Sequence, residues 1–191
     1  MVTVSANAPI EVAISNAYGA IQDDATADLR NVIKEIDTNS KKKEQLRQIQ
    51  EQLVLAKAAA RTGDKSKIDK AFSDLGKSLK APTGVDTTLT DYDSTTSLGK
   101  AFNEQSGIKS NGQFKTSSDP ASDTSKEYDA YFEALETQLK SEMDRHSDIS
   151  SKLQVEMNTK SSILRRSEQA VSDNESAFQK TKDGIQRNYK G

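Results

Sequence analysis

The chain has 191 residues, of which 33% are hydrophobic, 5% aromatic and 29% charged, and its formal net charge is −2. So few apolar and aromatic side chains cannot fill a thick globular interior, which favours thin layers of helices. The balanced charge gives no long-range attraction for nucleic acid or an anionic membrane, and the absence of cysteine excludes disulfides, thiolate nucleophiles and Cys-based metal sites.

Residues 1–9 form the first predicted segment, which we expect to be flexible. They lack the basic and apolar regions of a cleavable secretory signal. The uncharged residues from Val2 to Ala8 suit an uncleaved export signal. No apolar stretch approaches the roughly 20 residues that span a bilayer, so we expect no membrane insertion.

Residues 10–63 are predicted to be helical, because apolar residues recur every three or four positions. The polar run 37–44 is either a turn between two helices or a solvated part of one helix, and we favour a turn. Gly63 is a plausible C-terminal stop. The apolar positions are Ile10, Ile14, Ala17, Ile21, Ala25, Leu29, Val32 or Ile33, Ile36, Leu46, Ile49, Leu53, Ala56 and Ala60.

Residues 64–119 are predicted to be a loop-rich middle. Asp64 can cap a short helix that carries Ile68, Phe72, Leu75 and Leu79 on one stripe, and Pro82 ends it. The polar composition of residues 83–97 indicates an exposed loop.

A second short helix is expected around Leu98, Ala101 and Phe102, started by Ser94 or Thr95 and closed by Gly107. Asn111 and Gly112 then lie between two short arms. This dipeptide is the strongest local signal for a tight hairpin turn, so we expect a small β-hairpin there.

Residues 120–191 are predicted to form one long helix. Asp119–Pro120 offers a cap, and the stretch 124–127 is a capping box one turn later. A first apolar seam contains Tyr128, Phe132, Leu135, Leu139, Ile149 and Leu153, interrupted by Glu142 and His146. Beyond it apolar residues recur every seventh position, at Met157, Leu164, Val171, Phe178 and Ile185.

The positions three residues after these heptad anchors are polar: Lys160, Ser167, Asn174 and Thr181. A two-stranded coiled coil would favour leucine there. The seam is therefore too dilute for tight pairing and long enough to need cover from other helices. We predict an assembly interface at Leu153, Met157, Leu164, Val171, Phe178 and Ile185. The alternative is a helical hairpin whose polar seam positions are merely solvated.

The predicted fold class is mainly α. The long N- and C-terminal helices pack as an antiparallel coiled-coil hairpin, and the middle holds short helices and a small β-hairpin. We predict no catalytic, cofactor or metal site. His146 stands without the partners of a nucleophilic or metal constellation, and Asp91 and Asp93 lack the later residues of a calcium loop.

The order of parts resembles the secreted hydrophilic proteins of bacterial type III secretion systems, especially EspA/SseB-like filament proteins. The resemblance is clearest from Leu153–Met157 through Ser172–Asp173 to Gly184–Ile185, and upstream from Phe102 to Ile108. It covers about half of the chain. The residues before position 64 are more polar than an EspA-like subunit would lead one to expect.

The resemblance implies a non-enzymatic, secreted subunit on the extracellular bacterial surface, exported by the type III route without a cleaved signal peptide. Such a subunit would assemble with itself into a filament that extends the needle, and would meet needle and translocator proteins and a cytosolic secretion chaperone. Two alternatives remain, a needle-tip protein that scaffolds the translocon and a cytosolic coiled-coil adaptor or chaperone.

Overall fold

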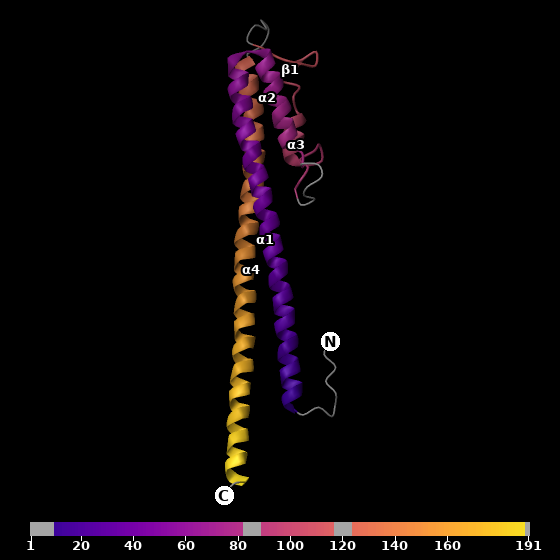
Figure 1. Ribbon diagram of the computed structural model, residues 1–191. Coiled ribbons are helices and arrows are strands. Elements are labelled where there is room, and N and C mark those ends of the chain that lie inside the picture. Colours follow the sequence, from indigo (N-terminus) through magenta and orange to yellow (C-terminus); the bar gives the residue numbers. More distant parts are fainter. Residues whose placement is uncertain (1–9, 82–88, 117–123, 190–191) are drawn as a thin grey trace. The chain divides into compact units, whose positions relative to one another are not determined.

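The computed structural model describes residues 10–81, 89–116 and 124–189. Within them the protein is mainly helical, as predicted, and its long N- and C-terminal helices pack against each other (Figure 1). The predicted flexible segment 1–9, the stop at Pro82 and the cap at Asp119–Pro120 lie outside the described residues. The elements are α1 (Ile10–Thr62), α2 (Lys65–Ser78), α3 (Ser97–Asn103), β1 (Lys109–Ser110), β2 (Gln113–Phe114) and α4 (Thr124–Tyr189).

The chain divides into two compact units. The terminal unit consists of Met1–Ile36 and Ser151–Gly191, and the central unit consists of Asp37–Ser150. Both α1 and α4 contribute a part to each unit. The two units are described separately below.

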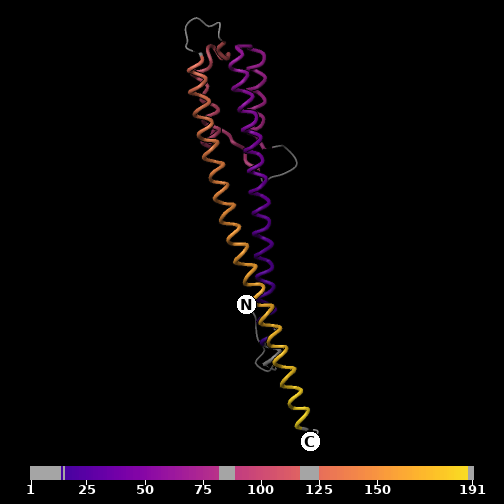
Figure 2. Tube along the Cα trace, turned by 90° about the vertical axis from the view of Figure 1, so that its left-hand side faces the viewer, coloured from indigo at the N-terminus to yellow at the C-terminus, as the bar shows by residue number. Residues whose placement is uncertain are grey.

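The polar run 37–44 is helical, so the favoured turn is wrong and α1 continues through it (Figure 2). The run contains neither glycine nor proline to break a helix. Its seam position is filled by Asn39, which is buried and hydrogen-bonded. Asn39 can be buried because its amide group is hydrogen-bonded, and the buried face of α1 therefore continues through a stretch that has no apolar residue.

The ends of α1 and α2 form where the sequence predicts them. Gly63 adopts a left-handed φ of 66° directly after α1, a conformation that favours glycine. The Asp64 side chain then accepts hydrogen bonds from the backbone N–H groups of Ser66 and Lys67 and caps α2. These bonds hold the pKa of the Asp64 carboxyl below its usual value.

The predicted boundaries of the second short helix are corrected by the structure. The cap of α3 is Thr96, whose hydroxyl accepts from the Gly99 N–H, and α3 ends at Asn103 rather than at Gly107. Thr95 does not cap, because its N–H and hydroxyl both donate to the Asp93 carboxylate at 2.8 and 2.6 Å. After α3, β1 and β2 pair as an antiparallel ribbon, with Asn111 and Gly112 in left-handed conformations between them.

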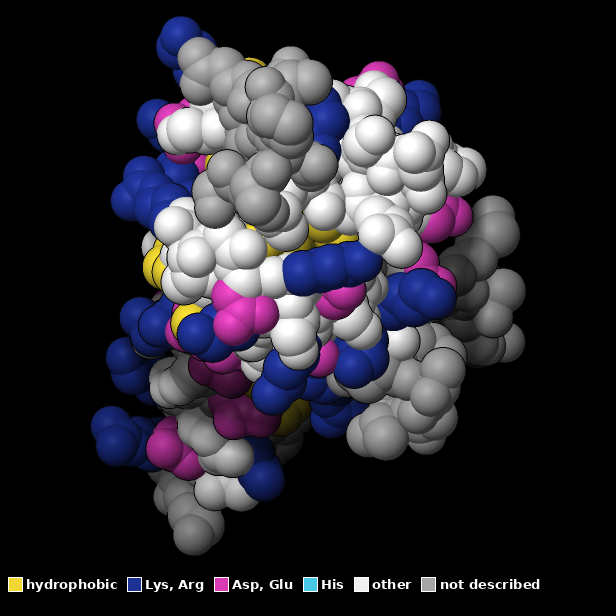
Figure 3. Space-filling view, turned by 90° about the horizontal axis from the view of Figure 1, so that it is seen from above, with side chains coloured by type: hydrophobic (Ala, Val, Ile, Leu, Met, Phe, Trp, Pro, Cys, Tyr) yellow, Lys and Arg dark blue, Asp and Glu magenta, His cyan; other side chains and the backbone are white. Residues whose placement is uncertain are grey.

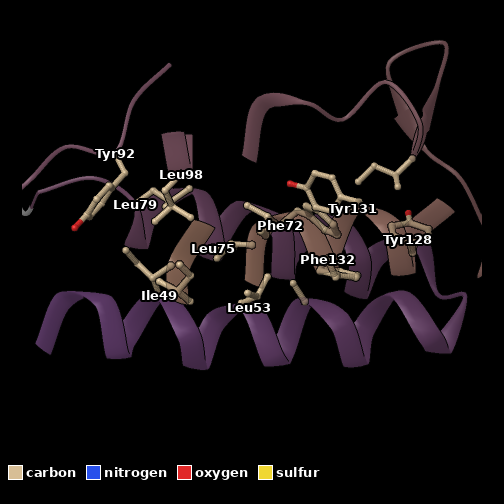
Figure 4. Packing of buried hydrophobic residues seen from close by; sticks show 14 of the residues in the cluster. Ile49, Leu53, Phe72, Leu75, Leu79, Tyr92, Leu98, Tyr128, Tyr131 and Phe132 are labelled. Atoms are coloured by element: carbon tan, nitrogen blue, oxygen red, sulfur yellow. The ribbon is translucent and has the colours of Figure 1, made fainter. Parts of the chain in front are cut away.

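The core lies in the central unit, where one face each of α1, α2, α3 and α4 meet (Figure 4). Phe72 is its centre, with ring centroids of Phe114, Tyr131 and Phe132 4.3, 5.8 and 5.9 Å away. The Tyr128 hydroxyl donates to the Lys115 carbonyl and the Tyr131 hydroxyl to the Phe102 carbonyl, so these rings are buried without losing hydrogen bonds. The predicted stripe of α2, Ile68, Phe72, Leu75 and Leu79, is buried here as expected.

In the terminal unit the buried line of α1 is narrower than predicted. Ala25 and Val32 are buried, and Leu29 and Ile36 are half-buried. The predicted seam members Ile14, Ala17 and Ile21, and Ile33 as the alternative to Val32, are exposed. The buried positions of α1 recur every seventh residue through Ala25, Val32, Asn39, Leu46 and Leu53. Spacing of three and four residues therefore predicts the apolar stripe of α1, but it does not predict which of its positions are the most buried.

Candidate assembly surface

Seven-residue spacing also organises the buried positions of α4. One line contains the buried residues Phe132, Leu139 and His146 in the central unit and Leu153 and Ser167 in the terminal unit, with half-buried Lys160 between the last two. Tyr128, Tyr131 and Leu135 are also buried in the central unit. Residues seven apart lie on nearly the same side of a helix, since seven residues make almost two turns. The covered side of α4 therefore becomes polar toward its C-terminus.

The predicted interface residues divide into three groups by exposure. Leu153 is buried within its own unit. Met157, Leu164 and Val171 are half-buried. Phe178 is 47% exposed and Ile185 is 54% exposed. The surface left for a partner is therefore centred on Phe178 and Ile185.

Two of the polar seam residues have partners inside the terminal unit. The Lys160 ammonium donates to the Asp28 carboxylate, and this hydrogen bond raises the pKa of Lys160. The Ser167 hydroxyl donates to the Leu164 carbonyl at 2.7 Å, within its own helix. These bonds let polar side chains occupy the seam, but they provide little of the apolar contact that leucine would give there.

The end of α4 carries an uncovered stripe. Every described side chain from Ser172 to Asn188 is exposed. Along this stretch Phe178 and Ile185 continue the line of Val171, while Ala170, Ala177 and Gly184 follow on one flank. Glu175 and Lys182, also seven residues apart, follow on the other. We call the stretch 172–188 the α4 end.

A buried polar cluster joins α1 and α4 in the central unit. The Asn39 amide nitrogen donates to the His146 carbonyl at 2.9 Å and to the Ser150 hydroxyl at 2.7 Å. Its amide oxygen lies 2.6 Å from His146 Nδ1, so it accepts, and the imidazole proton is on Nδ1. His146 Nε2 is buried and has no hydrogen-bond partner among the described atoms.

Charge and burial both act on this histidine. Burial lowers the pKa of His146 below its usual value near 6.5, and Arg145 and Lys42 lower it further. The neutral imidazole is thus the form that fits the seam. Its burial and its hydrogen bond to Asn39 are features of a packed structural residue.

One buried polar residue and two exposed apolar residues were missed from the sequence. Asn39 could have been found by extending the seven-residue spacing from Val32 to Leu46, which passes through it. Val54 and Leu55 on α1 are 61% and 56% exposed, and they lie beside the buried residue Leu53. The three-four spacing of Leu53, Ala56 and Ala60 leaves both residues off the seam, but it does not indicate what an exposed apolar pair would contact.

On the face seen in Figure 3, acidic and basic side chains are interspersed and only small apolar patches show between them. Within the described ranges 10–81, 89–116 and 124–189, no group of three or more acidic or histidine side chains could hold a metal ion. In the same part of the chain, no helix is long and apolar enough to cross a membrane.

No protein-family model, curated protein or solved structure matches this chain. The resemblance to type III filament proteins therefore stays a prediction.

Proposed function

We propose that this protein is a non-enzymatic structural subunit that assembles with copies of itself through the α4 end. The observation that carries the proposal is the exposure of Phe178 and Ile185 on a heptad line that is half-buried at Met157, Leu164 and Val171 further up the same helix. Burying a large apolar side chain contributes roughly 1.5–3 kcal/mol. A partner helix laid along this line would gain that contribution from both residues.

Charge favours a second copy in antiparallel orientation as the partner. In an antiparallel pair with Phe178 in the seam, Glu175 of one copy faces Lys182 of the other, and the symmetry repeats the pair. In a parallel, in-register pair the same two residues would face the small side chains of Ala170 and Ala177. Only the antiparallel arrangement therefore gives each of these charges an opposite charge.

Small residues on the other flank suit the same arrangement. Ala170, Ala177 and Gly184 leave room for two helix backbones to approach closely beside the apolar line. The α4 end is roughly 25 Å long at about 1.5 Å per residue. Such a short contact is weak by itself, so we expect assembly to depend strongly on concentration.

The finer description of the fold belongs to this proposal. We infer that α1 and α4 form an antiparallel coiled-coil hairpin. Support comes from the pairing of Asn39 with Ser150 and of Lys57 with Glu136, because a later position in α1 pairs with an earlier one in α4. The predicted flexible segment 1–9 and the segment boundaries at 10–63, 64–119 and 120–191 complete this description.

The resemblance supplies the biological setting of the proposal. The subunit is exported by a type III system and extends its needle on the bacterial surface, where it meets the translocator proteins. A cytosolic chaperone covers the α4 end before export, because exposed apolar stripes associate prematurely. A needle-tip protein and a cytosolic adaptor are the two alternatives that the experiments must separate.

The proposal is tested by sedimentation velocity and electron microscopy of the full-length chain over a range of concentrations. Phe178→Asp places a charge on the apolar line and should remove the contact between α4 ends, so that association weakens strongly while the far-ultraviolet circular dichroism stays unchanged. Ser176→Asp is the matched control, because it adds the same charge two residues away, nearly opposite on the helix. Association of Phe178→Asp as strong as that of wild type would refute the proposal.

A charge reversal tests the orientation of the pair. Glu175→Lys alone places two lysines opposite each other and should weaken association roughly five- to thirty-fold, in keeping with exposed pairs. The double variant Glu175→Lys/Lys182→Glu should restore it. A double variant as weak as the single one would exclude the antiparallel register.

The size of the assembly and its location separate the alternatives. Growth without limit indicates a filament subunit, whereas closure at a small ring indicates a needle-tip protein. If the protein is found only inside cells, and deletion of residues 1–20 does not change its export, the cytosolic adaptor is indicated.

A further inference from the structure

An antiparallel contact between identical α4 ends uses the same surface on both copies. Such an isologous contact closes at two copies and cannot by itself produce a filament. Growth needs a second contact elsewhere on the subunit. The central unit carries two different surfaces that suit this role.

The first surface lies on the outer side of α1, and we call it the outer patch. Val54 and Leu55 are 61% and 56% exposed and border a shallow depression. Arg47 and Arg61 lie seven residues before and after Val54, so all three share one side of the helix. The outer patch consists of Arg47, Gln50, Glu51, Val54, Leu55 and Arg61.

The second surface is a groove of about 920 Å³ between α4 and the stretch from Ser97 to Ile108. We call it the acidic groove. Its floor is apolar, since Ala101, Ile108, Ala130, Tyr131 and Ala134 line it. Its charged lining residues are Glu104, Glu127 and Glu133 against a single lysine, Lys100.

Two of these glutamates are available to an outside partner. Glu127 already forms an ion pair with Lys115 at 2.9 Å within the central unit. Glu104 and Glu133 are exposed at the rim. The floor between them includes exposed Ala130 and Ala134, whose small side chains allow close approach of a helix.

We propose that the outer patch of one copy docks into the acidic groove of the next copy. Val54 and Leu55 would cover Ala130 and Ala134, while Arg47 and Arg61 meet Glu104 and Glu133. The one acidic residue of the outer patch, Glu51, can also meet the one basic residue of the acidic groove, Lys100. Complementary charge suppresses wrong partners and sets the register of such a contact.

This contact is heterologous, because the two surfaces share no residue. Each subunit carries an outer patch and an acidic groove. A subunit whose groove is occupied still has a free patch for the next copy, so the contact can repeat along a chain of subunits. Head-to-tail docking through the central unit does not require the α4 contact. The head-to-tail contact would build one row of subunits, and the contact between α4 ends would join two such rows. A filament that contains both contacts therefore rests on the proposed function.

The test uses two charge-reversed variants in a Phe178→Asp background, where the α4 contact is removed. Variant one carries Arg47→Glu/Arg61→Glu, and variant two carries Glu104→Arg/Glu133→Arg. Each alone has a patch and a groove of like charge and should stay monomeric. Mixed in equal amounts, each patch meets an oppositely charged groove, so large alternating complexes should appear in sedimentation velocity.

The control reverses two exposed lysines, Lys70 on α2 and Lys80 just after it, as Lys70→Glu/Lys80→Glu in the same background. It makes the same change of charge as variant one and should associate head-to-tail like Phe178→Asp alone. Circular dichroism of all variants should match wild type. We expect the mixture to associate at least ten-fold more tightly than either variant alone.

The outcomes separate the two proposals. Growth on mixing supports the head-to-tail contact, whatever Phe178→Asp does to wild-type assembly. A mixture that sediments as monomers overturns it, and this includes the case in which a segment of the same chain covers the groove. Loss of wild-type assembly in Phe178→Asp, together with monomers on mixing, would leave the α4 contact standing and remove only this inference.

Discussion

The two units use the same two helices with different results. In the central unit, α2 and α3 pack beside α1 and α4, and Leu46, Ile49 and Phe132 are at most 2% exposed. The described residues of the terminal unit belong only to α1 and α4, and Met157, Leu164 and Val171 remain half-buried there. Two helices cover one seam incompletely, whereas additional elements close it.

This difference indicates where stability and assembly reside. Deletion of buried apolar groups destabilises in proportion to the cavity it leaves. We therefore expect core substitutions in the central unit to reduce stability strongly. Substitutions in the terminal unit should act mainly on association. Four variants or conditions test this division, beginning with the largest expected effect.

Phe132→Ala should reduce the free energy of unfolding by about 3–5 kcal/mol, because it removes a ring that is 1% exposed and packed against Phe72, Tyr128 and Tyr131. Phe178→Ala is the matched change in the terminal unit and should cost less than about 1 kcal/mol. Urea unfolding followed by circular dichroism at low concentration measures both. Equal losses would contradict the division.

Gly99→Ala should destabilise by roughly 3 kcal/mol, the upper range for overpacking. A Cβ at Gly99 would lie 1.8 Å from the Asp93 carbonyl oxygen, so the turn before α3 must move. Gly19→Ala in the terminal unit meets no atom within 4 Å and should instead stabilise α1 by roughly 0.5–1 kcal/mol. Thermal unfolding of the pair should show shifts of opposite sign.

Much of this architecture could be predicted from the sequence because local chemistry determines it. Gly63, Asp64 and the Asn111–Gly112 turn act within a few residues of themselves, and the apolar stripe of α2 is regular. The continuity of α1 through residues 37–44 could not be predicted, because it depends on partners of Asn39 that lie more than a hundred residues away.

The sequence predicts which residues of the candidate site share one side of α4, but it does not predict how exposed each of them is. Seven-residue spacing identifies five of the six interface residues, from Met157 to Ile185, and Leu153 ends the seam before them. Which of them are covered depends on how far α1 extends beside α4, and no local signal encodes that. The polar partners of Lys160 and Ser167 are likewise decided by tertiary contacts.

Asn39→Ala should cost roughly 1–3 kcal/mol, because it leaves His146 Nδ1 and the Ser150 hydroxyl without their amide partner inside the seam. Ser40→Ala is the control, since Ser40 is the exposed neighbour on the same helix. Urea unfolding with both variants at pH 8 isolates the lost hydrogen bonds. A loss equal to that of Ser40→Ala would show that the cluster contributes nothing to stability.

Acidification should weaken the central unit through His146. Burial lowers its folded-state pKa, and Arg145, Lys42 and Lys43 lower it further, while Glu142 raises it. The unfolded chain therefore binds a proton before the native one does, and stability falls as the pH drops below about 6.5, by up to about 1.4 kcal/mol per unit. Above that pH the contribution is fully present.

The pH effect can be assigned because His146 is the only histidine in the chain. Unfolding free energies of wild type and His146→Gln are compared from pH 5.5 to 8. The wild-type curve should fall on acidification relative to the variant. Parallel curves would show that His146 titrates normally in the folded protein.

The most direct test of the central claim is hydrogen exchange of the α4 end at several protein concentrations. We predict that the backbone amides of residues 172–188 exchange rapidly in dilute solution and become protected as concentration rises, while those of residues 128–146 are protected throughout. Rapid exchange that does not change with concentration, or full protection of 172–188 in the dilute monomer, would contradict the claim that this stripe is completed by another copy.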